Sequence, residues 1–249
     1  MDPREDIIEE RLKNIRRIIA VSGGKGGIGK SLISSVLALN LSETGFKVGL
    51  LDLDFTSPST HIILGVDKTY PEEENGIIPP KIHGIEYMSL VFYTEDKPSP
   101  LRGFDISNAL IELLAITIWG QLDFLVIDMP PGIGDIMLDI IRLMKKCEFL
   151  LVTTPSKVTM ETVEKLMGVL KENKVPTLGL IENMKMENSP KFQLKKYGVP
   201  MLGEIMFDRS IEDSIGEPEK LLETNFSKSL GNILNQIAQS PQNYTRGKL

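Results

Sequence analysis

Short apolar runs alternate with longer amphipathic stretches along most of the chain. The runs contain few polar residues and are rich in branched side chains, as in RIIAV, VGLLDLD, FLVID, EFLLVTT and TLGLIEN. Such runs predict strands that are buried on both faces. Stretches with helical spacing lie between them, among them SLISSVLALNLSE and TMETVEKLMGVLKENK. This alternation predicts an α/β fold in which a mostly parallel sheet has helices on both faces.

Both ends of the chain have the pattern of helices. Asp2-Pro3 followed by Glu5 is typical of a helix start, and we expect an N-terminal helix within residues 1–16. Near the other end, FSKSLGNILNQIAQ has apolar residues at helical spacing. Its polar face lacks the lysines and arginines of a membrane-surface helix, so we expect this helix to dock on the core.

The middle of the chain follows the pattern less clearly. Residues 66–104 are rich in turn-forming residues around one strand predicted at 85–91. The polar segment KMENSPKFQLKKYG follows a strand predicted at 176–184. No repeat and no long linker interrupts the pattern, so we expect a single domain over residues 1–249.

Composition narrows the function classes. The chain is 41% apolar and 25% charged, as in ordinary globular proteins. Its net charge of −6 argues against a general nucleic-acid-binding protein. The most apolar helical stretch, ALIELLAITIW, is too short to span a bilayer, and the N-terminus is too charged for a secretory signal. We therefore expect a cytoplasmic protein that binds neither membranes nor nucleic acid.

The stretch SGGKGGIGKS carries the strongest chemical signal. Gly24, Gly29, Lys30 and Ser31 satisfy the pattern G-x-x-x-x-G-K-S between a predicted strand and a predicted helix. Glycines at these positions let backbone N–H groups turn around phosphate oxygens, and the helix N-terminus adds its dipole. Lys30 is expected to reach the β- and γ-phosphates and Ser31 to coordinate Mg²⁺. The stretch predicts phosphate binding, with Lys25 unexplained within one chain.

Three carboxylates end two of the predicted strands. Asp128 follows FLVI, and Asp52 and Asp54 close VGLLDLD. Parallel sheets bind ligands at the carboxyl ends of their strands, where carboxylates serve as outer-sphere partners of Mg²⁺. We expect Asp128 and Asp52 beside the metal and Asp54 orienting the attacking water.

The proline pair after Asp128 predicts a switch. Pro130-Pro131-Gly132 would stiffen and then bend the chain beside the γ-phosphate. Pro131 and Gly132 are the expected switch residues, with the Gly132 N–H sensing the phosphate.

Taken together, these motifs resemble the deviant Walker A group of P-loop ATPases that includes MinD, ParA and NifH, through GKGGIGKS at 24–31. Further segments are similar to its Mrp/ApbC branch of iron–sulfur cluster carriers: LLDLDFTSPSTHIILG, DFLVIDMPPGIGD, VTTPSKVTMETVEK, GLIENM and MLGEIMFDRSI. The resemblance implies a SIMIBI-type P-loop fold, Mg²⁺-dependent ATP hydrolysis, and a homodimer that sandwiches two nucleotides.

The same resemblance assigns the remaining site residues. Lys25 would be the signature lysine that reaches the nucleotide of the partner subunit and stabilises charge on the transferred phosphoryl group. Asn183 matches the asparagine that reads adenine, since an amide offers a donor and an acceptor. The implied catalytic residues are Lys25, Lys30 and Asp54. The implied nucleotide contacts are Gly24, Lys25, Gly26, Gly27, Ile28, Gly29, Lys30, Ser31 and Asn183.

Two features depart from the family pattern. The carriers hold a cluster with a C-x-x-C pair soon after the ENM segment, whereas this chain contains one cysteine, Cys147, elsewhere. Iron–sulfur ligation requires thiolates, so cluster carriage by the usual route is not expected. In the first switch segment, Ser57 and His61 stand where the family more often has glycine and proline.

Three functions remain open at this stage. The first is an ATPase of the Mrp/ApbC type that acts in iron–sulfur or metallocluster assembly, or in a derived task, on an unknown client protein. The second is a regulatory or positioning switch like MinD or ParA. The third is an adaptor that binds nucleotide with little turnover, against which Lys25, Asp54 and Asp128 argue.

Overall fold

The computed structural model describes residues 2–67, 69–94, 104–190 and 198–239. Its centre is an eight-stranded sheet with the order β10-β9-β8-β1-β7-β2-β6-β5. All neighbouring strands pair in parallel except β5 with β6. The strands are β1 Ile15–Gly23, β2 Val48–Asp52, β5 Lys81–Ile82, β6 Ile85–Ser89, β7 Leu122–Asp128, β8 Cys147–Thr153, β9 Thr177–Lys185 and β10 Met201–Met206. A separate small ribbon pairs β3 (Glu72–Glu73) with β4 (Ile77–Ile78).

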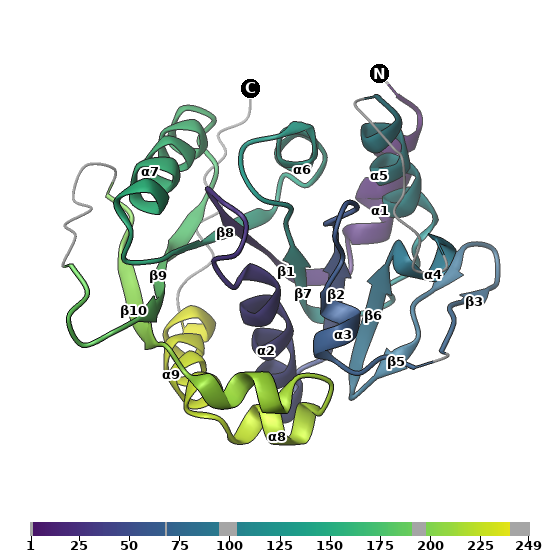
Figure 1. The fold of residues 1–249 in the computed structure, drawn as a ribbon. Coiled ribbons are helices and arrows are strands. Elements are labelled where there is room, and N and C mark those ends of the chain that lie inside the picture. Colours follow the sequence, from purple (N-terminus) through teal and green to yellow (C-terminus); the bar gives the residue numbers. More distant parts are fainter. Residues whose placement is uncertain (1, 68, 95–103, 191–197, 240–249) are drawn as a thin grey trace.

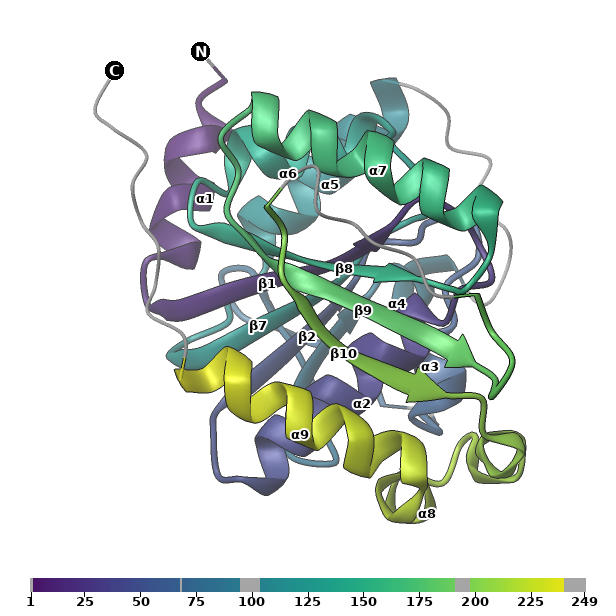
Figure 2. The ribbon, with the colours of Figure 1, turned by 90° about the vertical axis from the view of Figure 1, so that its left-hand side faces the viewer.

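Helices cover both faces of the sheet, as Figure 2 shows. One face carries α1 (Arg4–Leu12), α5 (Phe104–Ile116), α6 (Asp135–Leu143) and α7 (Lys157–Glu172). The other carries α2 (Lys30–Glu43), α3 (Thr60–Ile63), α8 (Pro218–Glu223) and α9 (Asn225–Gln239). The short α4 (Val91–Thr94) follows β6, and a 3-10 helix, η1 (Arg209–Ser214), follows β10. Each face has its own buried apolar cluster, so the predicted α/β architecture is confirmed.

The main strands and helices lie where the apolar pattern predicts them, but several boundaries differ. The N-terminal helix is shorter than the expected 1–16, because it ends at Leu12 and β1 already begins at Ile15. Asp2 contributes to its start, since its Oδ1 accepts from the Arg4 N–H at 3.0 Å. In the middle of the chain, the short β3, β4 and β5 and the helix α4 carry too few residues for a periodic signal. Parts of the loop-rich stretch and of the polar segment after β9 lie outside the described residues.

The C-terminal helix docks on the core, as its pattern predicts. Phe226, Leu230, Ile233, Leu234 and Ile237 are all buried. They belong to the same buried apolar cluster as the residues of α2. Figure 1 shows α9 beside α2. Among the described residues, no helix has the length and apolarity needed to cross a bilayer. The cytoplasmic location stays a prediction.

A buried ion pair connects the two central strands to this last helix. Arg17 of β1 and Glu148 of β8 are each 3% exposed, and Arg17 Nε donates to Glu148 Oε2 at 2.8 Å. A second guanidinium nitrogen donates to the Ile237 carbonyl at 2.5 Å. The guanidinium also lies 5.9 Å from the centre of the Phe124 ring. One side chain therefore links β1, β7, β8 and α9.

We expect Glu148→Gln to be strongly destabilising. The substitution leaves the Arg17 charge buried without its counter-charge, which costs about 3–5 kcal/mol of unfolding free energy. Chemical denaturation monitored by circular dichroism measures this loss. The control is Glu217→Gln, which breaks the exposed ion pair with Lys220 and should change stability by less than about 0.5 kcal/mol. Equal effects of the two substitutions would contradict the importance of the buried pair.

Candidate functional site

The glycine-rich loop follows β1 and ends at the start of α2. Gly29 is the N-cap of α2 and adopts a left-handed conformation, with φ 85° and no side-chain cap. The first N–H groups of α2 therefore keep their hydrogen-bonding capacity and point toward the loop. With the helix dipole they form a site suited to anions.

Two glycines of this loop are required by close packing. A Cβ on Gly29 would lie 2.3 Å from Asn183 Nδ2, and its positive φ disfavours other residues as well. A Cβ on Gly24 would lie 2.4 Å from the Thr162 hydroxyl. The loop is thus held between β9 on one side and α7 on the other.

The two lysines of the loop lie in different environments. Lys30 is 6% exposed, and its Nζ donates to the Lys25 carbonyl at 3.4 Å. Burial lowers the pKa of Lys30, and the charges of Asp128 and Asp54 partly offset this. Lys25 is exposed, and no hydrogen bond or ion pair engages its ammonium among the residues that the structure describes. Lys30 therefore faces the pocket of its own chain, whereas the Lys25 side chain is available to another molecule.

Asp128 lies beneath the loop at the end of β7. Ser34 of α2 donates to its Oδ1 at 3.0 Å. Its Oδ2 is buried and has no hydrogen-bond partner among the described residues. The register pairs Asp128 with Asp52 at the end of β2, so the two carboxylates are neighbours across the sheet. Burial, and next the negative charge of Asp52, raise the pKa of Asp128 to about 7.

We expect this carboxyl to make stability depend on pH. In the unfolded chain Asp128 has the ordinary aspartate pKa of 3.8, whereas in the folded protein its pKa is about 7. Between these values the folded state holds one more proton, so stability falls as pH rises, by roughly 4 kcal/mol over the whole window. Urea unfolding at about pH 4 and about pH 8 measures this decline.

The control for this effect is Asp128→Asn, which does not titrate. Part of the decline should disappear in this variant, which should be more stable than the wild type at the higher pH. The remainder comes from Asp52, because burial raises the pKa of Asp52 as well. Parallel declines in the two proteins would assign the pH dependence to other groups.

Asp52 and Asp54 hold the segment that follows β2. Asp52 is 1% exposed, and its Oδ1 accepts from the Asp54 N–H at 3.0 Å. Asp54 lines the pocket, and its Oδ1 accepts from the Thr56 hydroxyl at 2.7 Å and from the Ser57 N–H at 3.1 Å. These bonds fall on Oδ1, which leaves Oδ2 able to accept from a further donor.

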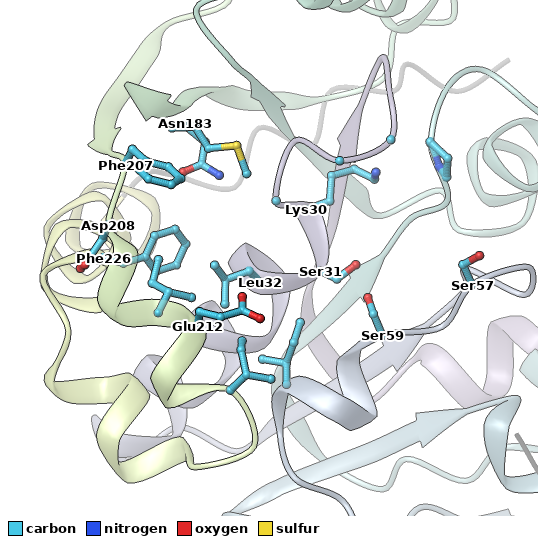
Figure 3. A pocket seen from close by; sticks show the side chains of 18 of the residues that line it. Lys30, Ser31, Leu32, Ser57, Ser59, Asn183, Phe207, Asp208, Glu212 and Phe226 are labelled. Carbon is cyan, nitrogen blue, oxygen red and sulfur yellow. The ribbon is translucent and has the colours of Figure 1, made fainter. Parts of the chain in front are cut away.

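A pocket of about 850 Å³ lies in front of the loop (Figure 3). Of the predicted site residues, eight line it: Gly26, Gly27, Gly29, Lys30, Ser31, Asp54, Pro131 and Asn183. The others lie close by. Lys25 is exposed on the loop, and Gly24, Ile28, Asp52 and Asp128 support the loop or the strand ends behind it. The structure thus gathers these residues around one site.

Asn183 joins the far wall of the pocket to the loop. It is 2% exposed, and its Nδ2 donates to the Ile28 carbonyl at 2.9 Å. An amide has two N–H donors and one oxygen acceptor, so Oδ1 and one N–H remain for a ligand. In Figure 3 the side chain lies beside Phe207 at the end of the pocket opposite Ser57.

Several lining residues were not predicted individually from the sequence. They come from the end of β10, from η1 and from the start of α9, and are Met206, Phe207, Asp208, Arg209, Ile211, Glu212, Ile215 and Phe226. The segment MLGEIMFDRSI resembles the family, but that resemblance assigns no roles to its residues. Its position directly after a predicted strand was the available signal, since the carboxyl ends of parallel strands share one edge of a sheet.

Pro131 and Gly132, the predicted switch residues, contact the phosphate loop and the end of β1 directly. The Gly132 N–H donates to the Gly23 carbonyl at 3.0 Å, and Gly132 has a φ of 85°. Pro131 lies against Gly26, where a Cβ would be 3.9 Å from the proline Cβ. To contact a phosphate, the Gly132 N–H must exchange its carbonyl partner for the ligand. One hydrogen bond therefore couples the segment after β7 to the start of the phosphate loop.

The donor set fits Mg²⁺ better than an iron–sulfur cluster. The buried Asp128 Oδ2, which has no hydrogen-bond partner among the described residues, and the nearby Ser31 hydroxyl are oxygen ligands of the kind that Mg²⁺ prefers. Cys147 is 2% exposed within β8, so its thiol is not presented to a surface cluster. Among the described residues, no group of three or more cysteine, histidine and acidic side chains converges on one point. These residues do not provide a cluster site.

Comparison with known proteins confirms the resemblance seen in the motifs. A family model described as the NUBPL iron-transfer P-loop NTPase of the ParA group matches residues 14–241. An iron–sulfur cluster carrier protein of Aquifex aeolicus is 33% identical over 259 residues, covering 94% of this chain and 71% of the relative. The iron–sulfur cluster transfer protein NUBPL of Dictyostelium discoideum is 36% identical over 221 residues, covering 82% of this chain and 68% of the relative. The chain thus spans about two thirds of the length of these relatives.

Solved structures share the fold over most of the chain. A nucleotide-binding protein of Archaeoglobus fulgidus, solved in complex with ADP, superposes with a TM-score of 0.69 at 29% identity. The match covers 96% of this chain and 94% of that protein. The cell division ATPase MinD of Pyrococcus furiosus has a TM-score of 0.66 at 23% identity, covering 90% of this chain and 99% of that protein, and shows a common fold alone. The chain therefore belongs to the NUBPL-type, iron-transfer family of P-loop NTPases.

Proposed function

We propose that the protein binds Mg²⁺-ATP in the pocket and hydrolyses it as a nucleotide-dependent homodimer. The task would be iron–sulfur or metallocluster assembly, or a derived task on a client protein. One observation supports this most directly: the buried Lys30 lies at the N-terminus of α2, beside a pocket that Asp54 also lines, and Asp128 accepts a hydrogen bond from Ser34 of the same helix. An anion site with a cation and two carboxylates at one strand edge suits a metal-bound triphosphate better than a simple phosphate.

The nucleotide would extend along the whole pocket. Backbone N–H groups between Gly24 and Ser31 would hold the phosphates, with Lys30 on the β- and γ-phosphates. Adenine would lie at the other end, where Asn183 Oδ1 can accept from the amino group of the base, since the bond of Asn183 to Ile28 uses Nδ2. Phe207 and Phe226 line the same end and offer apolar surface to the base.

The metal would be held by Ser31 and, through water, by Asp128. Mg²⁺ bound there would neutralise charge on the phosphates during transfer. Both oxygens of Asp52 already accept hydrogen bonds from Asp54 and Thr60. Asp52 would therefore act on the metal through its negative charge. Because Lys30 and both carboxylates are buried, water would screen their charges little, and they would act strongly on the metal and the phosphates.

Hydrolysis would depend on one residue of each subunit. Asp54 would orient the attacking water through its free Oδ2. Lys25 of the second copy would stabilise charge on the transferred phosphoryl group, which agrees with the exposure of Lys25 and with the absence of a partner for its ammonium among the described residues. Pro131 and Gly132 would respond to the γ-phosphate when the Gly132 N–H exchanges its Gly23 partner.

The proposal is tested by nucleotide binding and turnover of the purified chain. We expect saturable ATP binding by calorimetry, and phosphate release that requires Mg²⁺ and rises more than linearly with protein concentration. No ATP binding at millimolar nucleotide would overturn the proposal. Iron and sulfide analysis after anaerobic reconstitution tests the cargo separately, and we expect no stoichiometric cluster because Cys147 is buried.

The MinD- or ParA-like switch is less well supported. Such a switch needs a helix that binds a membrane or a basic surface that binds DNA. The apolar face of α9 is buried against the sheet and α2, which removes the candidate helix for this role. Co-sedimentation with liposomes and with DNA in the presence of ATP tests this alternative.

A further inference from the structure

Both ends of the segment after β2 are bound to the same carboxylate. At its start, the Asp54 N–H donates to Asp52 Oδ1 at 3.0 Å. At its end, Thr60 donates to Asp52 Oδ2 twice, from its hydroxyl at 2.5 Å and from its N–H at 3.3 Å. The loop between Asp54 and Thr60 is thereby closed on one side chain.

A buried tyrosine supports this closure from the neighbouring strand. The hydroxyls of Tyr87 and Thr60 lie 2.9 Å apart, and both residues are 0% exposed. The single hydroxyl proton of Thr60 is directed to Asp52, so Tyr87 donates the proton in the bond between the two hydroxyls. Tyr87 belongs to β6, which pairs with β2 along its length. The clamp formed by Tyr87, Thr60 and Asp52 is therefore anchored in the sheet at both ends.

The closed loop carries the residues that face the phosphate end of the pocket. Asp54, Thr56, Ser57 and Ser59 line the pocket, and Figure 3 shows the Ser57 and Ser59 side chains at this end. Within the loop, Asp54 Oδ1 is fixed by bonds from Thr56 and Ser57. A shift of Thr60 would therefore move the carboxylate that is proposed to orient the water.

We propose that Thr60, through Asp52 and supported by Tyr87, is a positioning residue that fixes Asp54 for hydrolysis. This inference rests on the proposed function, and gives Asp52 a task in addition to its charge near the metal. A misplacement of about 1 Å at a reacting group is enough to reduce turnover by about 100-fold. The clamp touches no part of the pocket that would bind the base. Its loss should therefore change the rate of hydrolysis and leave nucleotide affinity nearly unchanged.

The test compares Thr60→Val with Thr60→Ser in the full chain. Valine keeps the shape and removes the hydroxyl, so we expect kcat to fall between about 10- and 100-fold. The dissociation constant for ATP should stay within about three-fold of the wild type. Serine restores the hydroxyl and should recover most of the turnover. Tyr87→Phe leaves the bond from Thr60 to Asp52 in place, so it should produce a smaller loss of turnover.

The matched control is Thr117→Val. Thr117 is buried outside the pocket, and its hydroxyl donates to the Leu113 carbonyl. This substitution should leave kcat unchanged. Hydrogen exchange of peptides covering residues 53–61 gives a readout that does not depend on activity. We expect faster exchange there in Thr60→Val and not in Thr117→Val.

These readouts separate the two proposals. If the wild type hydrolyses ATP and Thr60→Val has the same kcat, the positioning role is overturned. Equal losses in the valine and serine variants would also overturn it, since packing rather than the hydroxyl would then matter. No turnover by the wild type would contradict the proposed function, whereas the exchange experiment would still decide whether the clamp closes the loop.

Discussion

Replacing Lys25 by alanine should abolish ATP turnover and leave ATP binding nearly intact. The Lys25 ammonium is exposed, whereas Lys30 reaches the pocket of its own chain. A cation that arrives from a second subunit stabilises the transition state without holding the ground state, and such cations contribute about 10³–10⁵ in kcat. Steady-state phosphate release and calorimetric ATP binding measure the two effects separately.

A mixing experiment distinguishes action across the dimer from action within one chain. Lys25→Ala and Asp54→Ala are each expected to be inactive. In a mixed dimer, the subunit that keeps Asp54 can receive Lys25 from its partner, which restores one site. An equal mixture should therefore recover about a quarter of wild-type turnover if subunits exchange freely. An inactive mixture, under conditions where dimers form, would mean that Lys25 acts within its own chain. Lys171→Ala, at an exposed lysine in the last turn of α7, is the control.

Asp54→Ala should also have a large effect. It should stop hydrolysis while dimer formation continues. The substitution removes the carboxylate proposed to orient water, so we expect kcat to fall by about 10²–10⁴. Phosphate binding by the loop and Lys30 does not require Asp54. ATP should therefore still bind, and the ATP-bound dimer should accumulate because hydrolysis no longer converts it to the ADP-bound form. Size-exclusion chromatography with light scattering, with ATP and with ADP, measures this accumulation.

The control for this experiment is Asp213→Ala, at an exposed carboxylate of η1. This variant should hydrolyse ATP and form the dimer like the wild type. Loss of ATP binding in Asp54→Ala would instead indicate that Asp54 holds the nucleotide or the loop. An unchanged rate would remove Asp54 from the mechanism.

The elements that sequence pattern predicted well are those whose signal is local. β1, β7 and β8 each contain an uninterrupted apolar run, because both of their faces are covered by helices. The phosphate loop is similarly local, since its glycines, its lysine and the following helix are adjacent in the chain. The short β3 and β5 were missed because two residues carry no measurable period.

The pocket could be predicted only in part. Its phosphate end comes from motifs that can be read one at a time. Its base end combines Asn183 of β9, η1 and Phe226 of α9, and depends on which strands become neighbours. Apolar periodicity identifies strands but does not specify their order in a sheet.

The sequence by itself determined the family, the P-loop and the α/β class, because these depend on residues close together along the chain. Only the tertiary structure decided which polar groups meet across long separations. It paired Arg17 with Glu148 and the Ile237 carbonyl, and it closed the loop of Asp54 through Asp52 and Thr60 onto Tyr87. The physical reason is that a buried charge or hydroxyl must find a partner, and the folded chain decides which groups come within hydrogen-bonding distance.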